Sequence, residues 1–150
     1  MTGRVALEGT RGRALAPAVL EPLLVCGADR DGQAERLRHA TLVIRDGHQV
    51  IAAAMCRQVP RELRIEELGM VRANGDDEMA DVVLDALETA ALVAGSERLV
   101  VFSASRPLRR AMRLLGYVPQ TVGQRLGFVH HVQTTEPALR QRRTTAGTEA

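Results

Sequence analysis

The feature that most constrains the fold of this chain is a β-hairpin pattern near its centre. Two runs rich in strand-forming residues, Thr41–Arg45 and His48–Val59, are joined by the dipeptide Asp46-Gly47. Tight hairpin turns favour this dipeptide because their central residues adopt positive φ angles. Pro60 follows the second run and ends it, since proline has no N–H to donate to a strand. The pattern predicts that the sheet begins with antiparallel strands.

A third strand is predicted directly after the hairpin, over Glu62–Val71. Its apolar residues face one way as far as Ile65 and the other way from Leu68 onward, if the strand alternates regularly. This change of face predicts a bulge or a splay beside Gly69.

Helical spacing dominates the next part of the chain. Apolar residues recur every three or four positions from Asn74 to about Ala94, and Gly95 suits the end of that helix. The other expected elements are a short helix near Pro17, a polar helix ending at His39, a strand at Arg98–Ser103, a helix beginning at Ser105 and a last strand at Thr121–Val132. Gly27–Gly32 is predicted to be a loop.

This order of elements predicts an α/β (α+β) domain. We expect a mixed, mostly antiparallel sheet with a central βαβ unit and helices on both faces. The 150 residues suit one domain. Residues 1–13 are expected to form an N-terminal segment with an edge strand, residues 14–133 the domain, and residues 134–150 a flexible polar tail.

Composition excludes several functions. All 20 Lys and Arg residues are arginine, so Schiff-base chemistry and a lysine base are excluded. One Tyr, two Phe, no Trp and a net charge of +2 do not favour a nucleic-acid partner. Two cysteines are too few for a disulfide scaffold. The first residues lack a signal-peptide pattern and no apolar run is long enough to span a membrane, so we expect a cytoplasmic protein without membrane contact.

Three segments together resemble the GCN5-related N-acetyltransferase (GNAT) family over roughly Ala14 to Val132. One is the hairpin followed by Ile65-Glu66-Glu67-Leu68-Gly69-Met70, which looks like the central strand of that family. Another is the long helix after it. The third is Leu108-Arg109-Arg110-Ala111-Met112-Arg113-Leu114-Leu115-Gly116-Tyr117-Val118-Pro119, which matches a helix with a leucine-glycine-aromatic ending.

The resemblance implies that acyl-CoA or acetyl-CoA is a substrate. The family holds its pyrophosphate with backbone amides of a glycine-rich loop before the long helix, where the helix dipole favours an anion. It implies a thioester beside Leu68, Gly69 and Met70. The other residues implied to contact it are Arg72, Gly75 and Ser105.

The chain departs from the family pattern in two places, the phosphate-binding loop and the position of the catalytic tyrosine. Asp76, Asp77 and Glu78 stand where the pyrophosphate would bind, and like charges repel it; alternatively, they cap the helix and offset its dipole. The tyrosine that protonates the leaving thiolate in many members is replaced by Met112, which has no proton to donate. Tyr117 matches an aromatic position that usually packs.

The resemblance implies a catalytic base on the central strand, either Glu66 or Glu67. Regular alternation would place these two side chains on opposite faces, so we expect at most one of them in the cleft. No metal site is predicted, because the adjacent His130 and His131 would likewise point apart. Cys56 is expected to be a small core residue.

Two functions remain open on the sequence. One is transfer of an acyl group from acyl-CoA or a carrier-bound thioester to an amine. The alternative is a repurposed fold that binds a small ligand or protein, or performs other chemistry, in the same cleft. The corresponding partners are a small-molecule amine or a carrier protein. A homodimer could form through Thr121–Val132. The arginines at 106, 109, 110 and 113 form either an anion site or a solvated helix face.

Overall fold

The computed structural model describes residues 5–24, 29–71, 76–102 and 105–132, with the side chains of Asp76 and Asp77 left out. The strands in this part of the chain are β1 (Val5–Gly9), β2 (Leu42–Asp46), β3 (Gln49–Val59), β4 (Glu62–Met70), β5 (Arg98–Val101), β6 (Val118–Val122) and β7 (Arg125–His131). The helices are α1 (Pro17–Leu20), the 3-10 turn η1 (Glu21–Leu23), α2 (Arg30–Arg38), α3 (Asp76–Val93) and α4 (Arg106–Leu114).

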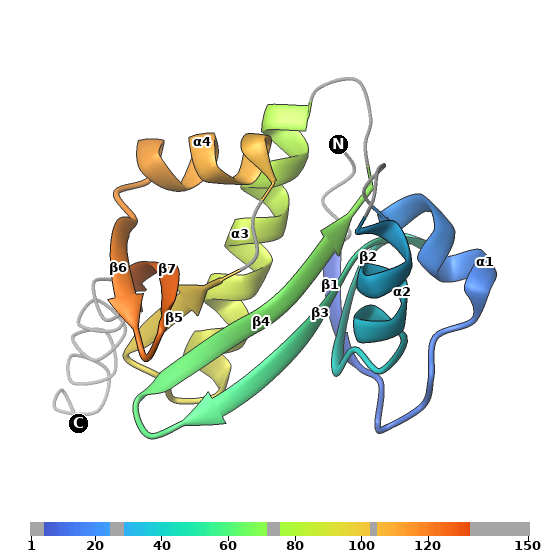
Figure 1. Cartoon of the computed structure of the whole chain (residues 1–150), viewed down its shortest axis with the longest axis horizontal. Coiled ribbons are helices and arrows are strands. Elements are labelled where there is room, and N and C mark those ends of the chain that lie inside the picture. The colour runs from blue at the N-terminus through green and yellow to red at the C-terminus, as the bar shows by residue number, and fades with distance from the viewer. Residues whose placement is uncertain (1–4, 25–28, 72–75, 103–104, 133–150) are drawn as a thin grey trace, which may run out of the picture.

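The strands form one sheet in the order β1-β2-β3-β4-β5-β7-β6 (Figure 1). All neighbours are antiparallel except β4 and β5, which are parallel and are connected by α3. Helix α2 and η1 pack on β3 and β4, whereas α3 packs on β1, β4 and β5 and contacts α4. The predicted fold class is therefore confirmed: a mixed sheet with a central βαβ unit and helices on both faces.

The predicted hairpin is present, with its turn displaced by one residue. Asp46 pairs with Gln49, so the two loop residues are Gly47 and His48 rather than Asp46 and Gly47. Only Gly47 of these two has a positive φ, 64°. Glycine at the first central position is the pattern of a type II′ turn, which matches the right-handed twist of the strands as well as type I′ does.

The expected single strand over Thr121–Val132 is wrong. This segment lies within a second hairpin, in which β6 pairs antiparallel with β7 at the sheet edge. Val122 pairs with Arg125, and Gly123 has a φ of 66° at the turn. The expected loop Gly27–Gly32 is also shorter than predicted, because α2 already begins at Arg30.

Strand β4 contains a bulge, three residues before its predicted position at Gly69. Met55 of β3 pairs with Glu67, but the next residue, Cys56, pairs with Ile65, so Glu66 is the extra residue. The bulge restores one core face along the whole strand: Leu63, Ile65 and Leu68 are all buried in the main hydrophobic core. The expected change of apolar face is therefore wrong, because an extra residue offsets it.

The opposite face of β4 lies against α2 and η1. Glu67 pairs with Arg36 of α2, and Gly69 lies so close to Leu37 and Leu23 that no side chain would fit. Gly69 thus lets the helices approach the strand at this point.

None of the helices in the described ranges is both long and apolar enough to cross a membrane.

Replacing Gly69 by alanine is expected to destabilise the protein by about 1–3 kcal/mol. The added Cβ would lie 2.6 Å from Leu37 Cδ1 and 2.8 Å from the Leu23 carbonyl oxygen. Gly9→Ala is the matched control, because the nearest atom to its new Cβ would be 4.0 Å away. Urea unfolding followed by circular dichroism measures both variants, and equal stability of Gly69→Ala and the parent would contradict the close approach.

Candidate functional site

Strands β4 and β5 part halfway along β4. Their parallel pairing ends at Ile65 and Val101, and the last backbone hydrogen bond runs from Phe102 N to Ile65 O at 3.1 Å. Strand β4 continues to Met70, still paired with β3 on its other side. The carboxyl-terminal half of β4 therefore has an edge facing away from β3 that β5 does not cover (Figure 1).

The pairing with β3 identifies which backbone groups lie on this edge. Val71 N donates to Ile51 O at 2.9 Å, so residues at every second position from Val71 direct their N–H and C=O toward β3. Leu68 and Met70 are the alternate residues, and their backbone groups face the gap beside β5. The Leu68 carbonyl is 3.5 Å from Nε2 of the buried Gln33 of α2.

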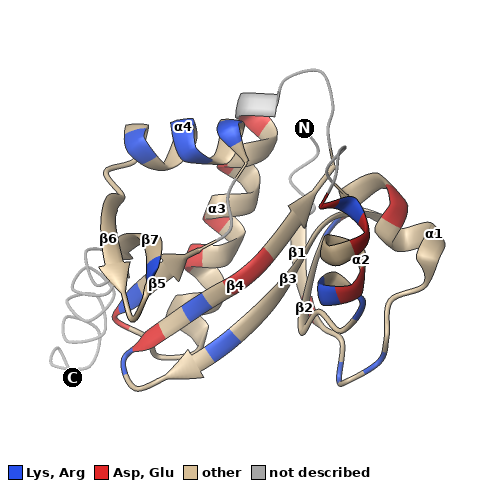
Figure 2. Cartoon of the chain, viewed as in Figure 1, with Lys and Arg blue, Asp and Glu red and all other residues tan. Residues whose placement is uncertain are grey.

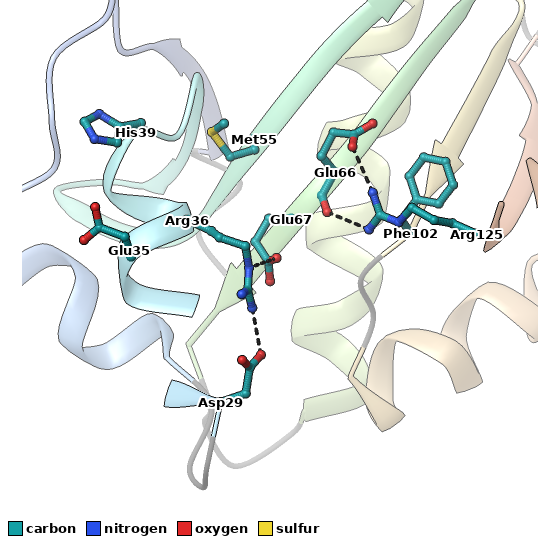
Figure 3. A pocket seen from close by; sticks show the side chains of 9 residues that line it. All are labelled: Asp29, Glu35, Arg36, His39, Met55, Glu66, Glu67, Phe102 and Arg125. Carbon is teal, nitrogen blue, oxygen red and sulfur yellow. Dashed lines mark hydrogen bonds and ion pairs between the residues drawn. The ribbon is translucent and has the colours of Figure 1, made fainter. Parts of the chain in front are cut away.

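A cavity of about 770 Å³ opens next to the bulge (Figure 3). It is bounded by α2, by β3 and β4, and by residues at the end of β5 and the start of β7. Its lining residues are Asp29, Glu35, Arg36, His39, Met55, Glu66, Glu67, Phe102 and Arg125. Small-molecule sites are concave and usually combine apolar walls with a few polar groups; here the apolar walls are Met55 and Phe102, and the other lining residues are charged or polar.

Glu66 and Glu67 both line this cavity, which corrects the expectation that at most one of them could reach it. The bulge is the physical reason. Glu66 is the unpaired extra residue, so the strict alternation that separates neighbouring side chains is interrupted between it and Glu67.

Glu67 is the more deeply buried of the two carboxylates. Its side chain is 10% exposed, and its Oε1 accepts a hydrogen bond from Arg36 Nε at 2.6 Å. The same guanidinium donates through Nη2 to Asp29 Oδ2 at 2.7 Å. These hydrogen bonds, to Asp29 first and then to Glu67, raise the pKa of Arg36 above its usual value. Arg36 therefore bridges the carboxylate of Glu67 in β4 and that of Asp29, the residue before α2 (Figure 3).

Glu66 is held from the other side of the gap. Arg125 Nη1 lies 2.9 Å from Glu66 Oε1, and Arg125 Nη2 donates to the Glu66 carbonyl at 3.3 Å. The guanidinium also lies over the Phe102 ring, 4.3 Å from its centroid, in a cation–π contact. Arg125 thus connects the start of β7 to the bulge. Because the Glu66 side chain is 31% exposed, it is the more accessible carboxylate.

The other sequence-predicted contact residues are placed as follows. Leu68 is buried, Met70 is partly buried against the core, and Gly69 faces α2. Leu68 and Met70 can offer backbone atoms to the gap, and none of the three has a polar side chain. Ser105 precedes α4, and its buried Oγ is without a hydrogen-bond partner among the residues that the structure describes. Arg72 and Gly75 lie outside the described residues.

Helix α3, which follows the predicted phosphate loop, begins at Asp76. The sequence placed its start at Asn74, two residues earlier, which is within the usual uncertainty of helix boundaries. Glu78 is exposed in its first turn. The side chains of Asp76 and Asp77 are outside the described part of the chain. Their effect on an anion therefore stays a prediction.

Met112 and Tyr117 are both away from the cavity lining. Met112 is fully buried in the core. Tyr117 is also buried: its hydroxyl donates to Glu88 Oε2 at 2.7 Å, and its ring stacks on His130 at 4.4 Å. Burial, reinforced by Glu88, raises the pKa of Tyr117 far above its usual value. The hydroxyl therefore stays protonated as a donor within the packed interior.

The described residues do not favour a cysteine nucleophile or a metal site with histidine ligands. Burial raises the pKa of Cys56 to about 11, so this thiol is neutral and unreactive at physiological pH. In the ranges the structure describes, no three His, Cys, Asp or Glu side chains come together as a metal site would require.

Sequence reasoning missed the two arginines that organise the cavity. Arg36 lies 31 residues before its partner Glu67, and Arg125 lies 59 residues after Glu66. No local spacing connects such pairs. Asp29 and Arg36 are seven residues apart, at the start and near the end of the α2 segment, and that spacing alone does not indicate a cavity.

The four arginines of α4 are exposed, and Figure 2 shows basic residues coloured blue along this helix. They line a separate shallow hollow of about 460 Å³ with Leu114. Both sequence interpretations, an anion site and a solvated face, are compatible with this arrangement.

Arg36→Met is expected to lower the free energy of unfolding by about 1–3 kcal/mol, because buried Glu67 loses the cation bonded to it. The double variant Arg36→Met, Glu67→Gln should regain part of this loss. Arg45→Met removes the more exposed pair with Glu8 and should cost about 0–1 kcal/mol. Chemical denaturation of the full cycle gives the coupling, and strictly additive effects would contradict a specific Arg36–Glu67 pair.

No protein-family model matches the chain, and no curated protein matches its sequence. Solved structures do match its fold. An acetyltransferase assigned to the GNAT family from Desulfovibrio desulfuricans aligns with a TM-score of 0.57 and 13% identity, covering 85% of this chain and 99% of that one. An IAA acetyltransferase from Bacillus cereus aligns with a TM-score of 0.53 and 16% identity, covering 83% and 96%.

The toxin AtaT, solved with acetyl-CoA and the C-terminus of its antitoxin AtaR, aligns with a TM-score of 0.53 and 15% identity. This match covers 89% of the present chain and 97% of AtaT. The matches span nearly the whole of each solved chain. The chain therefore has the fold of the GNAT acetyltransferases.

Proposed function

We propose that this protein transfers an acyl group from a thioester, such as acetyl-CoA, to an amine in the cavity beside the bulge. One observation carries the proposal: the uncovered edge of β4 runs past two carboxylates that line an open cavity. An edge of this kind offers N–H donors to a carbonyl oxygen, and the carboxylates offer a proton acceptor next to it. The acetyl-CoA bound to AtaT is a further support from a protein of the same fold.

The donor would lie along Leu68, Gly69 and Met70. The backbone N–H and C=O groups of Leu68 and Met70 face the gap, where they can bond an extended amide chain as a neighbouring strand would. An N–H directed at the thioester oxygen stabilises the negative charge that develops on it during attack. Ser105, with its buried hydroxyl, would add a donor at the beginning of α4.

Glu66 is the proposed base, acting directly or through a water molecule. It is more exposed than Glu67, and Arg125 holds both its carboxylate and its carbonyl in place. The amine nitrogen bonds to the acyl carbon, the carbon–sulfur bond breaks, and the thiol leaves as a thiolate. Glu66 accepts the proton of the attacking nitrogen, and solvent returns a proton to the thiolate, since Met112 cannot.

Glu67 is proposed to position Arg36 rather than to touch the reacting atoms. Its carboxylate is nearly enclosed and bonded to that guanidinium at 2.6 Å. Arg36 in turn holds Asp29 beside the cavity. Loss of Glu67 would therefore disturb the geometry of the cavity wall more than the proton transfer itself.

A second candidate function is ligand binding without acyl transfer. It is favoured by two side chains that already donate hydrogen bonds to carbonyl groups at the open edge, where a thioester donor would bind. Arg125 donates to the Glu66 carbonyl, and Gln33 donates to the Leu68 carbonyl. It is also favoured by the acids at the start of α3. Turnover separates the two candidates, because only the first consumes the thioester.

Calorimetric titration with acetyl-CoA, followed by an assay of thiol release with amine acceptors, tests the proposal. We expect binding in the micromolar range, and Glu66→Gln should lower kcat by about a hundredfold or more with little change in acetyl-CoA affinity. Asp81→Asn, on the exposed side of α3, is the control and should leave both values unchanged. Absence of heat and of thiol release at millimolar acetyl-CoA would exclude free coenzyme A as donor.

Replacing Asp76 and Asp77 by glycine tests the acids at the phosphate position. If they repel the pyrophosphate, each replacement should raise the affinity for acetyl-CoA by about fivefold. Asp81→Gly, one turn further along α3, is the control for loss of helix propensity and should give no gain. Unchanged affinity in the double variant would mean that the acids only cap the helix.

A further inference from the structure

A second cavity, of about 650 Å³, lies at the β1 end of the sheet. It is bounded by β1, β2 and β3 and by the chain between Thr10 and Val19, and it shares no lining residue with the cavity beside the bulge. Glu8 pairs directly with Val43, and Arg45 follows two residues later on β2, so these three side chains lie on one face of the sheet. Helix α2 has its main sheet contacts with β3 and β4, which leaves the β1 end of this face to the cavity.

Aliphatic residues form much of the cavity wall. Val43, on the sheet, is only 3% exposed. The others are partly buried and come from β3 and from the chain that leads into α1: Val50, Leu15 and Val19. The wall therefore offers apolar surface that a ligand can remove from water.

Three arginines line the same cavity, and two of them are unmatched. Arg45 Nε lies 3.2 Å from Glu8 Oε1, so this arginine is paired within the lining. Arg11 and Arg13 have no ion pair or side-chain hydrogen bond with any residue in the described ranges. Three guanidinium groups and one carboxylate leave an excess of two positive charges in the lining. Such a cavity attracts anions.

The backbone at Arg11 does not favour an arginine. The φ angles of Arg11 and Gly12 are 55° and 80°, and Arg13 N donates to Thr10 O at 3.1 Å, which is the pattern of a type I′ turn. Asparagine, aspartate and glycine are preferred at such positions. A residue that breaks a local preference is expected where its side chain has a function. Figure 2 shows basic residues on this segment between β1 and α1.

The segment that carries the two arginines is fixed on both sides of the turn. Before it, Thr10 N donates to Thr41 O at 3.1 Å, and Thr10 Oγ1 donates to Ala40 O at 2.7 Å. After it, Leu15 N donates to Arg38 O at 2.9 Å. A ligand would therefore meet a backbone that is already ordered, which lowers the entropy lost on binding.

We propose that this cavity binds a small amphipathic anion, a single aliphatic chain with a carboxylate or phosphate head group. The head group bonds to Arg11 and Arg13, because a guanidinium matches the paired oxygens of either anion. The aliphatic chain lies against Val43 and its neighbours in the wall. This site is additional to the proposed acyl transfer and does not depend on it.

Calorimetric titration of the full chain with octanoate, octyl phosphate, 1-octanol and butyrate tests the head group and the chain separately. At low salt, at least one of the two octyl anions should bind about tenfold more tightly than 1-octanol, which has no charge. Butyrate should bind about tenfold more weakly than octanoate or worse, because its shorter chain buries less apolar surface. The tighter of the two octyl anions identifies the head group.

The double variant Arg11→Asn, Arg13→Gln should weaken binding of the octyl anions by about five- to tenfold and leave 1-octanol unchanged. Both positions are exposed and asparagine is favoured at positive φ, so this variant should fold normally. Arg57→Gln, at an exposed position of β3 outside the lining, is the matched control and should bind like the parent.

Three results would overturn the proposal. One is equal affinity for 1-octanol and for both octyl anions. Another is unchanged anion affinity in the double variant, which would place the anion elsewhere on the protein. The third is absence of binding of both octyl anions at millimolar concentration.

Discussion

The single extra residue in β4 is the constraint on which the rest of the structure depends. Opposite one step of β3, from Met55 to Cys56, β4 takes two steps, from Ile65 to Glu67. The added residue keeps Ile65 and Leu68 buried in the same hydrophobic core. It also brings Glu66 and Glu67 to one cavity. The pairing of β5 with β4 ends at Ile65, the residue before the bulge. Core packing and the carboxylate pair therefore share one local cause, and the open strand edge begins beside it.

Two guanidinium groups then make the carboxylates compatible with folding. Buried carboxylates are costly unless they are paired and hydrogen-bonded. Arg36 reaches Glu67 from the helix side, and Arg125 reaches Glu66 from the far side of the gap. Each arginine belongs to an element that must already be docked on the sheet for the pair to form. The site is thus assembled by tertiary packing of α2 and β7 against β4, and its charge is set by residues that neighbour each other only in the folded protein.

The sequence predicted the elements with strong local signals and misplaced those without them. The hairpin was predictable because a glycine turn lies between two strand-forming runs, and the long helix because its apolar period continues from Met79 to Leu92. The β6–β7 hairpin was missed because the segment from Val118 to His131 has no comparable break other than Gly123. The sequence placed the bulge at Gly69 instead of Glu66, because the apolar pattern shows only that the buried face changes and not at which residue. Which residue is left unpaired depends on the register with β3.

Taken by itself, the sequence determined the order of strands and helices as far as α4, the fold class and the identity of the central strand with its two adjacent glutamates, because these depend on periodicity and on turn residues that are local in the chain. It also determined that Met112 has no proton to donate. Only the tertiary structure decided that both glutamates line one cavity and that Arg36 and Arg125 hold them. These features join residues up to 59 positions apart, and such contacts are set by how the elements pack and leave no periodic trace in the sequence.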